Sequence, residues 1–445
     1  MANSRRLARA AGVAAAMLAL GCALPAVAGN AAWTQVGYNS GHTGYNSTEK
    51  KITAKNAASL VSSGSFNTQG QIIDQPVIYK GMVYTRSGDG NLYAFNQKTG
   101  AIAWSIGNYA SPIGPNWGMA AADDKLVVSC VTGDNTSGLC AYNAKSGKSL
   151  WIYGLTSGGG YSPPTIAGDT VYFLTSGAES GGSVNAQHLS AVNLKNGKEI
   201  WRIWYCDDYP TCEGFGGSPA VDNGVIYVGC SGVARYPVIQ VVGVCAFTTG
   251  GSLLWQHQLG NDSSGNGTDG NGNLVAQNGR VYAAYETNCT QCNYSLDITA
   301  LNGASGTAQW DTPIAGPFNG EAYFAGPPVL GPDGSTYEVI GEGGGDGYEQ
   351  LFALNAKGSL RWKDGNSVAF AGTPTLVGKG KKGVLFFSCA TGQGTGTTCA
   401  FDASKGSFLW ESSDANDTPA YSPIVTGGVV YNSCGFNNIC IYQAQ

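Results

Sequence analysis

The stretch Leu92–Trp104, LYAFNQKTGAIAW, is the first of seven related copies along the chain. The others are AYNAKSGKSLW (141–151), AVNLKNGKEIW (191–201), AFTTGGSLLW (246–255), ALNGASGTAQW (300–310), ALNAKGSLRW (353–362) and AFDASKGSFLW (400–410). Their tryptophans recur every 47 to 55 residues, at Trp104, Trp151, Trp201, Trp255, Trp310, Trp362 and Trp410. A repeat of this length is typical of a solenoid or a propeller.

Each repeat predicts four short strands. A short apolar segment such as SPAV (218–221) precedes a turn and then a β-branched and aromatic run such as VIYVG (225–229). The repeated phrase adds two strands around a tight turn with glycine, which takes positive φ without steric cost. Four short strands per repeat form one propeller blade, so the fold is predicted to be all-β.

The number of strands predicts how the ring closes. Eight first strands and eight third strands can be counted, and no fourth strand follows the last third strand, ICIYQ (439–443). The segment SLVSSGSFN (59–67) aligns with that missing strand, with Gly64 in place of the tryptophan. We therefore expect one eight-bladed propeller over residues 59–445, closed by its N-terminal strand, which hides the open edge. A seven-bladed ring is the alternative.

Residues 1–28 resemble a secretory signal peptide. Three arginines precede the apolar run 10–24, and Ala26-Val27-Ala28 fits a cleavage site. Twin-arginine export and lipid attachment at Cys22 are alternatives, but Ala8 and Leu20 suit those signals poorly. We expect simple cleavage, export to the periplasm or the medium, and an N-terminal segment over residues 29–58 before the ring.

Composition excludes several classes of function. Without the signal, 21 basic and 29 acidic residues leave a net charge of −8 and no basic cluster, so nucleic-acid binding is not expected. No apolar run after the signal is long enough to span a bilayer. The 67 glycines and the 43% hydrophobic content fit a β-rich, loop-rich exported protein, which we expect to be a monomer.

The cysteines support this assignment of strands. Twelve remain after the signal, an even number for an oxidising compartment. Four end second strands and four begin third strands of the same blades, which predicts the pairs Cys130–Cys140, Cys230–Cys245, Cys389–Cys399 and Cys434–Cys440. Cys206–Cys212 and Cys289–Cys292 are expected within loops. The latter pair lacks the sequence context of a thioredoxin, haem or zinc motif, so a structural role is favoured.

Variable loops are predicted to share one face of the ring. Short, uniform turns join strands one to two and three to four, whereas the other connections are long and differ from repeat to repeat. Examples are residues 176–188, 205–217, 260–273, 317–326 and 341–350. Because binding sites are frequent on variable loops held by a rigid scaffold, this face is the predicted site.

One of these loops resembles a calcium loop. Asp262, Ser264 and Asn266 place oxygen ligands at alternate positions before a glycine, but Asn273 stands where an EF-hand has Glu. A polar Gly/Asn linker is the alternative interpretation.

The repeated phrase, A-x-[DN]-x-x-[ST]-G-x-x-x-W, resembles the repeat of pyrroloquinoline quinone (PQQ) type propellers. The first copy matches fully, the third has Asn196 before its glycine, and the fourth and sixth are one residue short. The opening WTQVGYNSGHTGYN (33–46) also resembles secreted members. The resemblance covers nearly the whole mature chain and implies blade packing, with each tryptophan docked between neighbouring blades.

Two functions are implied by the resemblance. Quinoprotein dehydrogenases of this type hold PQQ near the axis with Ca²⁺, a catalytic Asp and a disulfide between adjacent cysteines. Other relatives, such as the outer-membrane β-barrel assembly lipoprotein, present a face to partner proteins without a cofactor. This chain has no adjacent cysteines and no CxxCH motif. We therefore predict a platform that binds a protein or small ligand, with a PQQ- and calcium-dependent dehydrogenase as the alternative. Carboxylates that could serve the latter are Asp207, Asp208, Glu213, Glu321, Glu342 and Asp346.

Overall fold

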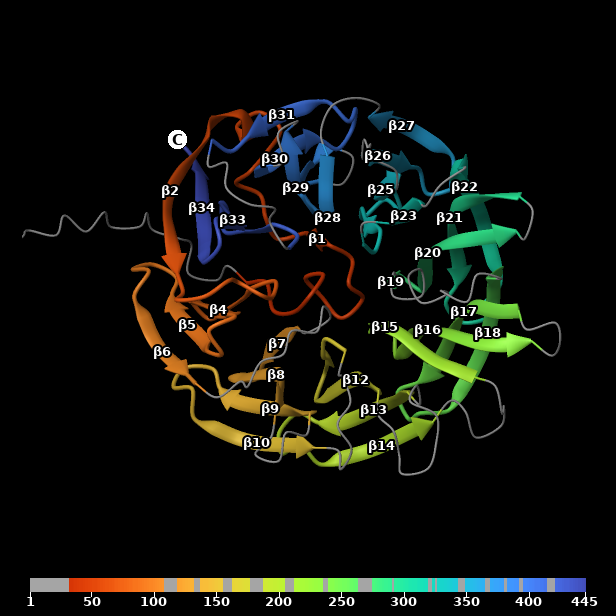
Figure 1. Ribbon diagram of the computed structural model, residues 1–445, viewed down its shortest axis with the longest axis horizontal. Coiled ribbons are helices and arrows are strands. Elements are labelled where there is room, and N and C mark those ends of the chain that lie inside the picture. Colours follow the sequence, from red (N-terminus) through yellow and green to blue (C-terminus); the bar gives the residue numbers. More distant parts are fainter. Residues whose placement is uncertain are drawn as a thin grey trace, which may run out of the picture.

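Eight antiparallel sheets stand around a central axis in the computed structural model (Figure 1). It describes residues 32–107, 118–131, 137–154, 162–176, 187–204, 212–234, 239–262, 274–289, 292–318, 322–324, 326–342, 349–364, 369–379, 382–391, 395–413 and 421–445. Each sheet is one blade. In seven blades the strands run outward from the axis in chain order, and in the eighth the outermost strand comes from the N-terminal part of the chain.

The first four blades each use four consecutive strands. Blade 1 contains β3 (Val77–Tyr79), β4 (Met82–Arg86), β5 (Leu92–Asn96) and β6 (Ile102–Ile106). Blade 2 contains β7 (Met119–Ala122), β8 (Lys125–Val131), β9 (Ser137–Asn143) and β10 (Ser149–Gly154). Blade 3 contains β11 (Thr165–Ala167), β12 (Thr170–Ser176), β13 (Gln187–Asn193) and β14 (Glu199–Trp204). Blade 4 contains β15 (Cys212–Asp222), β16 (Val225–Ala234), β17 (Ile239–Thr248) and β18 (Leu253–Asp262).

The remaining blades add small variations to this plan. Blade 5 contains β19 (Leu274–Gln277), β20 (Arg280–Cys289), β21 (Cys292–Asn302) and β22 (Ala308–Phe318). In blade 6, β23 (Ala322–Phe324) and β24 (Val329–Leu330) share the inner edge of β25 (Thr336–Glu342), followed by β26 (Glu349–Leu354) and β27 (Leu360–Asp364). Blade 7 contains β28 (Ala369–Val377), β29 (Val384–Thr391), β30 (Thr395–Asp402) and β31 (Phe408–Glu411). Blade 8 contains β32 (Ile424–Thr426), β33 (Val429–Cys434) and β34 (Asn438–Ala444).

The N-terminal strand closes the ring as predicted. β2 (Leu60–Asn67), which follows the 3₁₀ turn η1 (Ala57–Ser59), pairs antiparallel with β34 from Leu60 opposite Ala444 to Asn67 opposite Asn438. It supplies the outer strand of blade 8, so eight blades are present and the seven-bladed alternative is wrong. Blade 8 thus joins strands from both ends of the ring and covers the edge that β34 would otherwise expose.

Each repeat tryptophan forms a hydrogen bond across a blade interface. Its indole Nε1–H donates to a backbone carbonyl of the next blade. The acceptors are Ala144 for Trp104 (3.1 Å), Leu194 for Trp151 (3.0 Å), Thr249 for Trp201 (2.9 Å), Gly303 for Trp255 (2.9 Å), Ala356 for Trp310 (3.1 Å), Ala403 for Trp362 (3.2 Å) and Leu60 for Trp410 (2.8 Å).

The turn of the next blade is shaped to receive the indole ring. Gly197 has φ +67°, and a Cβ added there would lie 2.6 Å from Trp151 Cε3. Glycine is therefore required both by the left-handed backbone and by the close approach of the ring. This explains why the phrase contains both the glycine and the tryptophan: the glycine of one copy receives the tryptophan of the copy before it.

Four of the predicted disulfides tie second strands to third strands. They are Cys130–Cys140, Cys230–Cys245, Cys389–Cys399 and Cys434–Cys440. Cys206 lies outside the described residues, as do the side chains of Cys212, Cys289 and Cys292, so those two pairings stay predictions. Among the described residues, no helix has the length and hydropathy needed to span a membrane.

Residues 32–51, which we call the strap, run around the axis and contact the first strand of every blade in chain order. At blade 1, Trp33 and Ile78 exchange two backbone hydrogen bonds of 2.8 Å. Gln35 forms an isolated antiparallel β-bridge with Ala120 of blade 2, and its side-chain amide forms hydrogen bonds with the backbone of Ile166 in blade 3. The first strands of blades 4 to 7 each donate one backbone N–H to a carbonyl of the strap. The pairs are Val221 to Ser40 (2.6 Å), Ala276 to Gly41 (2.8 Å), Leu330 to Thr43 (2.9 Å) and Leu376 to Gly44 (2.9 Å). At blade 7 the strap forms β1 (Tyr45–Asn46), parallel to β28.

The strap completes its circle at blade 8. Asn46 Nδ2 donates to the carbonyl of Val425 at 2.8 Å, and Glu49 Oε2 accepts from Gly428 N–H at 2.7 Å. Thr426 Oγ1 reaches back to the carbonyl of Ala32 at 3.2 Å. The strap thereby binds both sides of the point at which the ring closes.

Replacing Trp410 by Ala should weaken the ring more than replacing Trp201 by Ala. Both indoles make the same kind of hydrogen bond, but Trp410 is 9% exposed and holds the closing strand, whereas Trp201 is only half-buried. We expect Trp410→Ala to lower the free energy of unfolding by about 3–5 kcal/mol, as measured by denaturant titration. Equal losses in the two variants would contradict a special role of the Trp410 contact in closure.

Gly41→Ala should disturb the strap. A Cβ at Gly41 would overlap the carbonyl oxygen of Ala276, which belongs to the first strand of blade 5. We expect a loss of about 1–3 kcal/mol in unfolding free energy and faster amide hydrogen exchange at Ala276. Gly250→Ala is the control, because its nearest neighbour would be Thr248 Oγ1 at 3.7 Å. Equal losses of unfolding free energy in Gly41→Ala and Gly250→Ala would contradict the close contact of Gly41 with Ala276.

Candidate binding site on the loop-rich face

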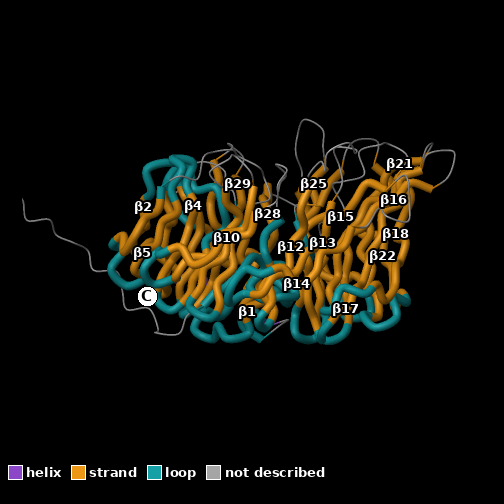
Figure 2. Tube along the Cα trace, turned by 90° about the horizontal axis from the view of Figure 1, so that it is seen from below, coloured by secondary structure: helices purple, strands orange, loops and turns teal. Residues whose placement is uncertain are grey.

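The two ends of the ring differ in their connections. Turns between strands one and two and between strands three and four emerge at one end, which we call the short-turn face. Connections between strands two and three and from one blade to the next emerge at the other end, the loop-rich face. The strap contacts the first strands close to the short turns, and in the side view β1 lies at that end of the ring (Figure 2).

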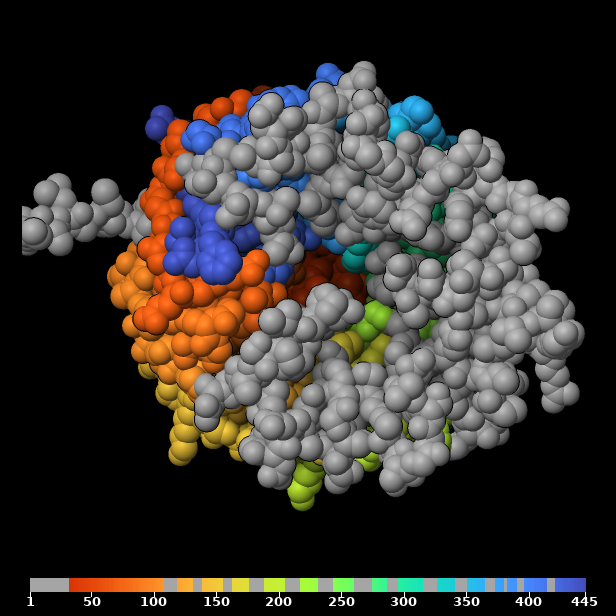
Figure 3. Space-filling model, in the orientation of Figure 1, coloured from red at the N-terminus to blue at the C-terminus, as the bar shows by residue number. Residues whose placement is uncertain are grey.

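The strap therefore forms the floor of the central channel. Seen from the loop-rich side, the molecule is hollowed at its centre, and the strap appears at depth in dark red (Figure 3). Because this floor binds all eight blades near the short-turn face, the hollow is approached from the loop-rich face. Concave sites at the ends of rigid scaffolds are where ligands usually bind.

His42 anchors the floor between blades 3 and 4. Its Nδ1 lies 2.9 Å from the carbonyl oxygen of Val36, and its Nε2 lies 2.8 Å from Thr165 Oγ1 and 2.9 Å from the carbonyl oxygen of Pro219. Burial lowers the pKa of His42, although the two carbonyl contacts oppose the shift. Because both of its ring nitrogens contact buried backbone or hydroxyl oxygens, His42 has a structural role in this position.

A buried ion pair lies on the inner part of blade 1. Both carboxylate oxygens of Asp74 accept from the Arg86 guanidinium, through Nε and through Nη2 at 2.6 Å. The side chains are 1% and 4% exposed. Tyr421 from blade 8 donates to the carbonyl of Ile72 nearby, and burial raises its pKa. Asp74 is therefore already saturated by Arg86 and does not offer ligand oxygens to the channel.

Glu338 is a buried acid between blades 5 and 6. It is 1% exposed, its Oε1 accepts from Val339 N–H at 3.0 Å, and its Oε2 has no hydrogen-bond partner among the described residues. Its cross-strand neighbour Phe352 packs with Leu296 and Ile340 in the apolar layer between these blades. Burial raises the pKa of Glu338 well above its usual range, because an apolar surrounding favours the uncharged form of the carboxyl.

The carboxylates predicted for a cofactor or metal fall outside the described part of the site. Glu213, Asp262 and Glu342 lie on β15, β18 and β25, but their side chains are not described. Outside the described residues are Asp207, Asp208, Ser264, Asn266, Glu321 and Asp346. The roles of these nine residues therefore stay predictions, because none of their side chains is described.

The described residues do not fit a PQQ and calcium site. Asp74 has both oxygens on Arg86, and Glu338 faces an apolar blade interface. Within the described residues, one group of three metal-ligating side chains lies close together, Cys389, Cys399 and Glu411, and its two sulfurs form a disulfide.

Sequence patterns missed the strap, Glu338 and the Asp74–Arg86 pair. The strap has no internal period, because each of its contacts is with a different blade. Glu338 lies in TYEVIGE (336–342), where alternation suggests a polar outer face. Inner strands of a propeller have both faces buried, so alternation does not mark exposure there.

Glu338→Gln should stabilise the protein increasingly as the pH rises. Because the pKa of Glu338 is raised in the folded state, the folded state holds this proton more tightly than the unfolded state does. The contribution of the proton to stability is therefore complete below the ordinary pKa of 4.5, and it declines as the pH rises toward the pKa in the folded state. The wild type should lose up to about 1.4 kcal/mol per pH unit relative to the variant in this range. Denaturant titrations from pH 4 to 9 measure it, and a pH-independent difference would show that Glu338 titrates normally.

Comparisons with known proteins agree with this architecture. Solved structures of quinohemoprotein alcohol dehydrogenase from Comamonas testosteroni (TM-score 0.66, 15% identity, 94% of this chain and 80% of that one) and of BamB from Moraxella catarrhalis (TM-score 0.55, 15% identity, 86% and 99%) are similar. At these identities the likeness shows the fold alone.

Sequence comparison finds one relative that matches part of the chain, and a family model that matches most of it. An outer membrane protein assembly factor BamB of Burkholderia pseudomallei (strain K96243) is 28% identical over 136 residues, which are 30% of this chain and 35% of that protein's length. A family model described as "Outer membrane protein assembly factor BamB" matches residues 47–115, 108–293 and 296–445. The chain therefore belongs to this family of PQQ-repeat propellers.

Proposed function

We propose that this protein is an exported, non-catalytic platform that binds a partner protein through its loop-rich face. The observation that carries the proposal is the strap, which covers the opposite end of the channel and binds all eight first strands. A partner that uses the hollow must then approach through the variable loops. The family description, an assembly factor, is in keeping with a platform of this kind.

Export is part of the proposal. Four cross-strand disulfides need an oxidising compartment such as the periplasm or the medium. The predicted signal peptide over residues 1–28 is the route by which the chain would reach it.

Exposed apolar side chains on the loop-rich face support protein binding. Phe436, in the turn between β33 and β34, is 60% exposed, and Ile73 on the neighbouring blade is 38% exposed. The backbone links the two positions, because Ile72 N–H donates to the carbonyl of Phe436 at 3.2 Å. Exposed aromatic and aliphatic groups of this kind are common at the centres of protein interfaces.

Site-specific cross-linking tests the proposal. A photoreactive amino acid at Phe436 should give discrete protein adducts in the cell envelope of the producing organism. The same substitution at Phe408 is the matched control, because it is 51% exposed at the start of β31, next to a short turn. Equal adducts from both positions, or adducts from neither, would contradict a platform that binds through the loop-rich face.

Cofactor titration separates the platform from a dehydrogenase. The mature protein with its disulfides intact would be titrated with PQQ in the presence and absence of Ca²⁺, following absorbance and fluorescence. We expect no saturable binding at micromolar PQQ. Binding of one equivalent that requires Ca²⁺ would replace the platform by a quinoprotein dehydrogenase, with ligands supplied by the loops.

A further inference from the structure

The four cross-strand disulfides occupy equivalent places but have different neighbours on the fourth strand. The residue paired with the third-strand cysteine is Ile152 in blade 2, Gln256 in blade 4, Ser65 in blade 8 and Glu411 in blade 7. Among the described disulfides, blade 7 alone has a carboxylate in this place. Its chemistry therefore differs from that of the other three.

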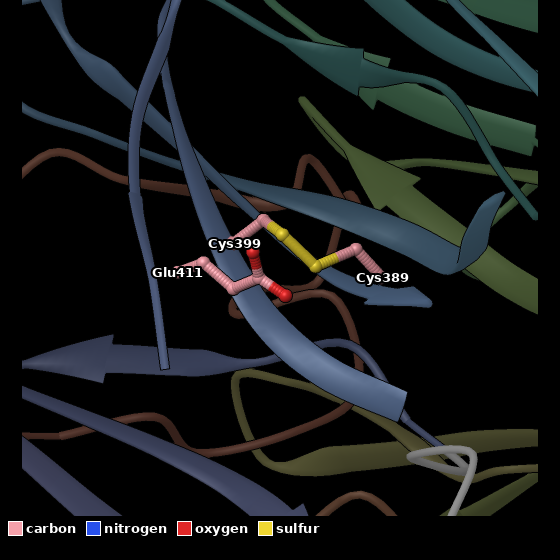
Figure 4. Close-up of side chains that lie close together, drawn as sticks. All are labelled: Cys389, Cys399 and Glu411. Atoms are coloured by element: carbon pink, nitrogen blue, oxygen red, sulfur yellow. A yellow bond between two sulfur atoms is a disulfide. The ribbon is translucent and has the colours of Figure 1, made fainter. Parts of the chain in front are cut away.

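The carboxylate of Glu411 lies beside both sulfurs (Figure 4). One oxygen of Glu411 and the Sγ atoms of Cys389 and Cys399 all lie within 4.8 Å of one another. Thr397 holds the carboxylate in place: its Oγ1 donates to Glu411 Oε1 at 2.9 Å and lies 3.0 Å from Cys389 Sγ. The equivalent position of Thr397 is Gly138 in blade 2 and Gly243 in blade 4, so neither blade has this hydroxyl.

Three of the four side chains in this group are buried. Cys389, Cys399 and Thr397 are 1%, 0% and 4% exposed, whereas Glu411 is only half-buried and marks the side open to solvent. Two thiolates and one carboxylate are a ligand set that suits Zn²⁺, with a fourth position left for water. Soft thiolates also favour Zn²⁺ over Mg²⁺ or Ca²⁺.

We propose that Cys389, Cys399 and Glu411 form a redox-gated site for a thiophilic divalent cation, Zn²⁺. In the oxidised chain the sulfurs are bonded to each other, and the site is closed to metal. A phosphine reductant supplies two electrons and breaks the S–S bond, and it is itself oxidised to the phosphine oxide with an oxygen from water, whose two protons complete the two thiols. Zn²⁺ then forms two S–Zn bonds and one O–Zn bond, and the two thiol protons leave to solvent.

Alkylation of the reduced full mature chain tests the site. The protein is reduced by a phosphine without oxygen, its native circular dichroism is checked, and iodoacetamide labelling of each cysteine is followed by mass spectrometry with and without Zn²⁺. We expect Zn²⁺ to slow labelling of Cys389 and Cys399 at least about tenfold. Cys130, Cys140, Cys230 and Cys245 are the internal controls, because they are equally buried but face Ile152 or Gln256.

The variant E411Q isolates the carboxylate. It keeps the size of the side chain and both cysteines, and it should lose most of the protection by Zn²⁺. In a parallel assay, Co²⁺ should give thiolate-to-cobalt charge-transfer absorption with the reduced wild type and none with the oxidised protein. Equal protection of all three cysteine pairs, full protection in E411Q, or loss of the native fold on reduction would each overturn the proposal.

Discussion

The ring depends on the hydrogen bond that each repeat tryptophan donates across a blade interface. Seven indoles bind carbonyls of the following blade. Six of them lie against the glycine of a turn there, and Trp410 binds Leu60 at the start of β2. At the eighth interface β2 has Gly64 instead, and Phe66 packs there on Phe95 with ring centroids 5.4 Å apart. An aromatic layer replaces the hydrogen bond at the one place where strands from the two ends of the ring meet.

Closing eight blades creates a second constraint at the axis. Every first strand presents an inner edge whose backbone groups would otherwise need water or a ligand. The strap satisfies at least one position on each of these edges, and at two of its glycines it passes too close to the blades for a side chain to fit. These are Gly41 and Gly44, where added Cβ atoms would meet Ala276 and Val329. The strap therefore forms the floor of the channel because it provides hydrogen-bond partners for the inner edges of the first strands.

The blades, the closure and four disulfides were predictable because their signals repeat. A tryptophan recurs every 47 to 55 residues, and the cysteines occur in pairs on neighbouring strands of the same blade. Each copy of these patterns predicts the same local arrangement of strands again. The strap and Glu338 were not predictable, because each is a single contact set between segments far apart in the chain. Polar residues such as Glu338 and Arg86 look exposed by alternation, yet both faces of an inner strand are buried.

The disulfides show how one end of the ring tolerates variation. Each described bond joins the second strand of a blade to the third strand of the same blade, across 6 to 15 residues. Such a bond limits the freedom of the loop ends in the unfolded chain and fixes their separation in the folded one. The loop between them can then change in sequence without changing the register of the strands. In these four blades, a variable loop is thus compatible with a fixed register of the strands that it joins.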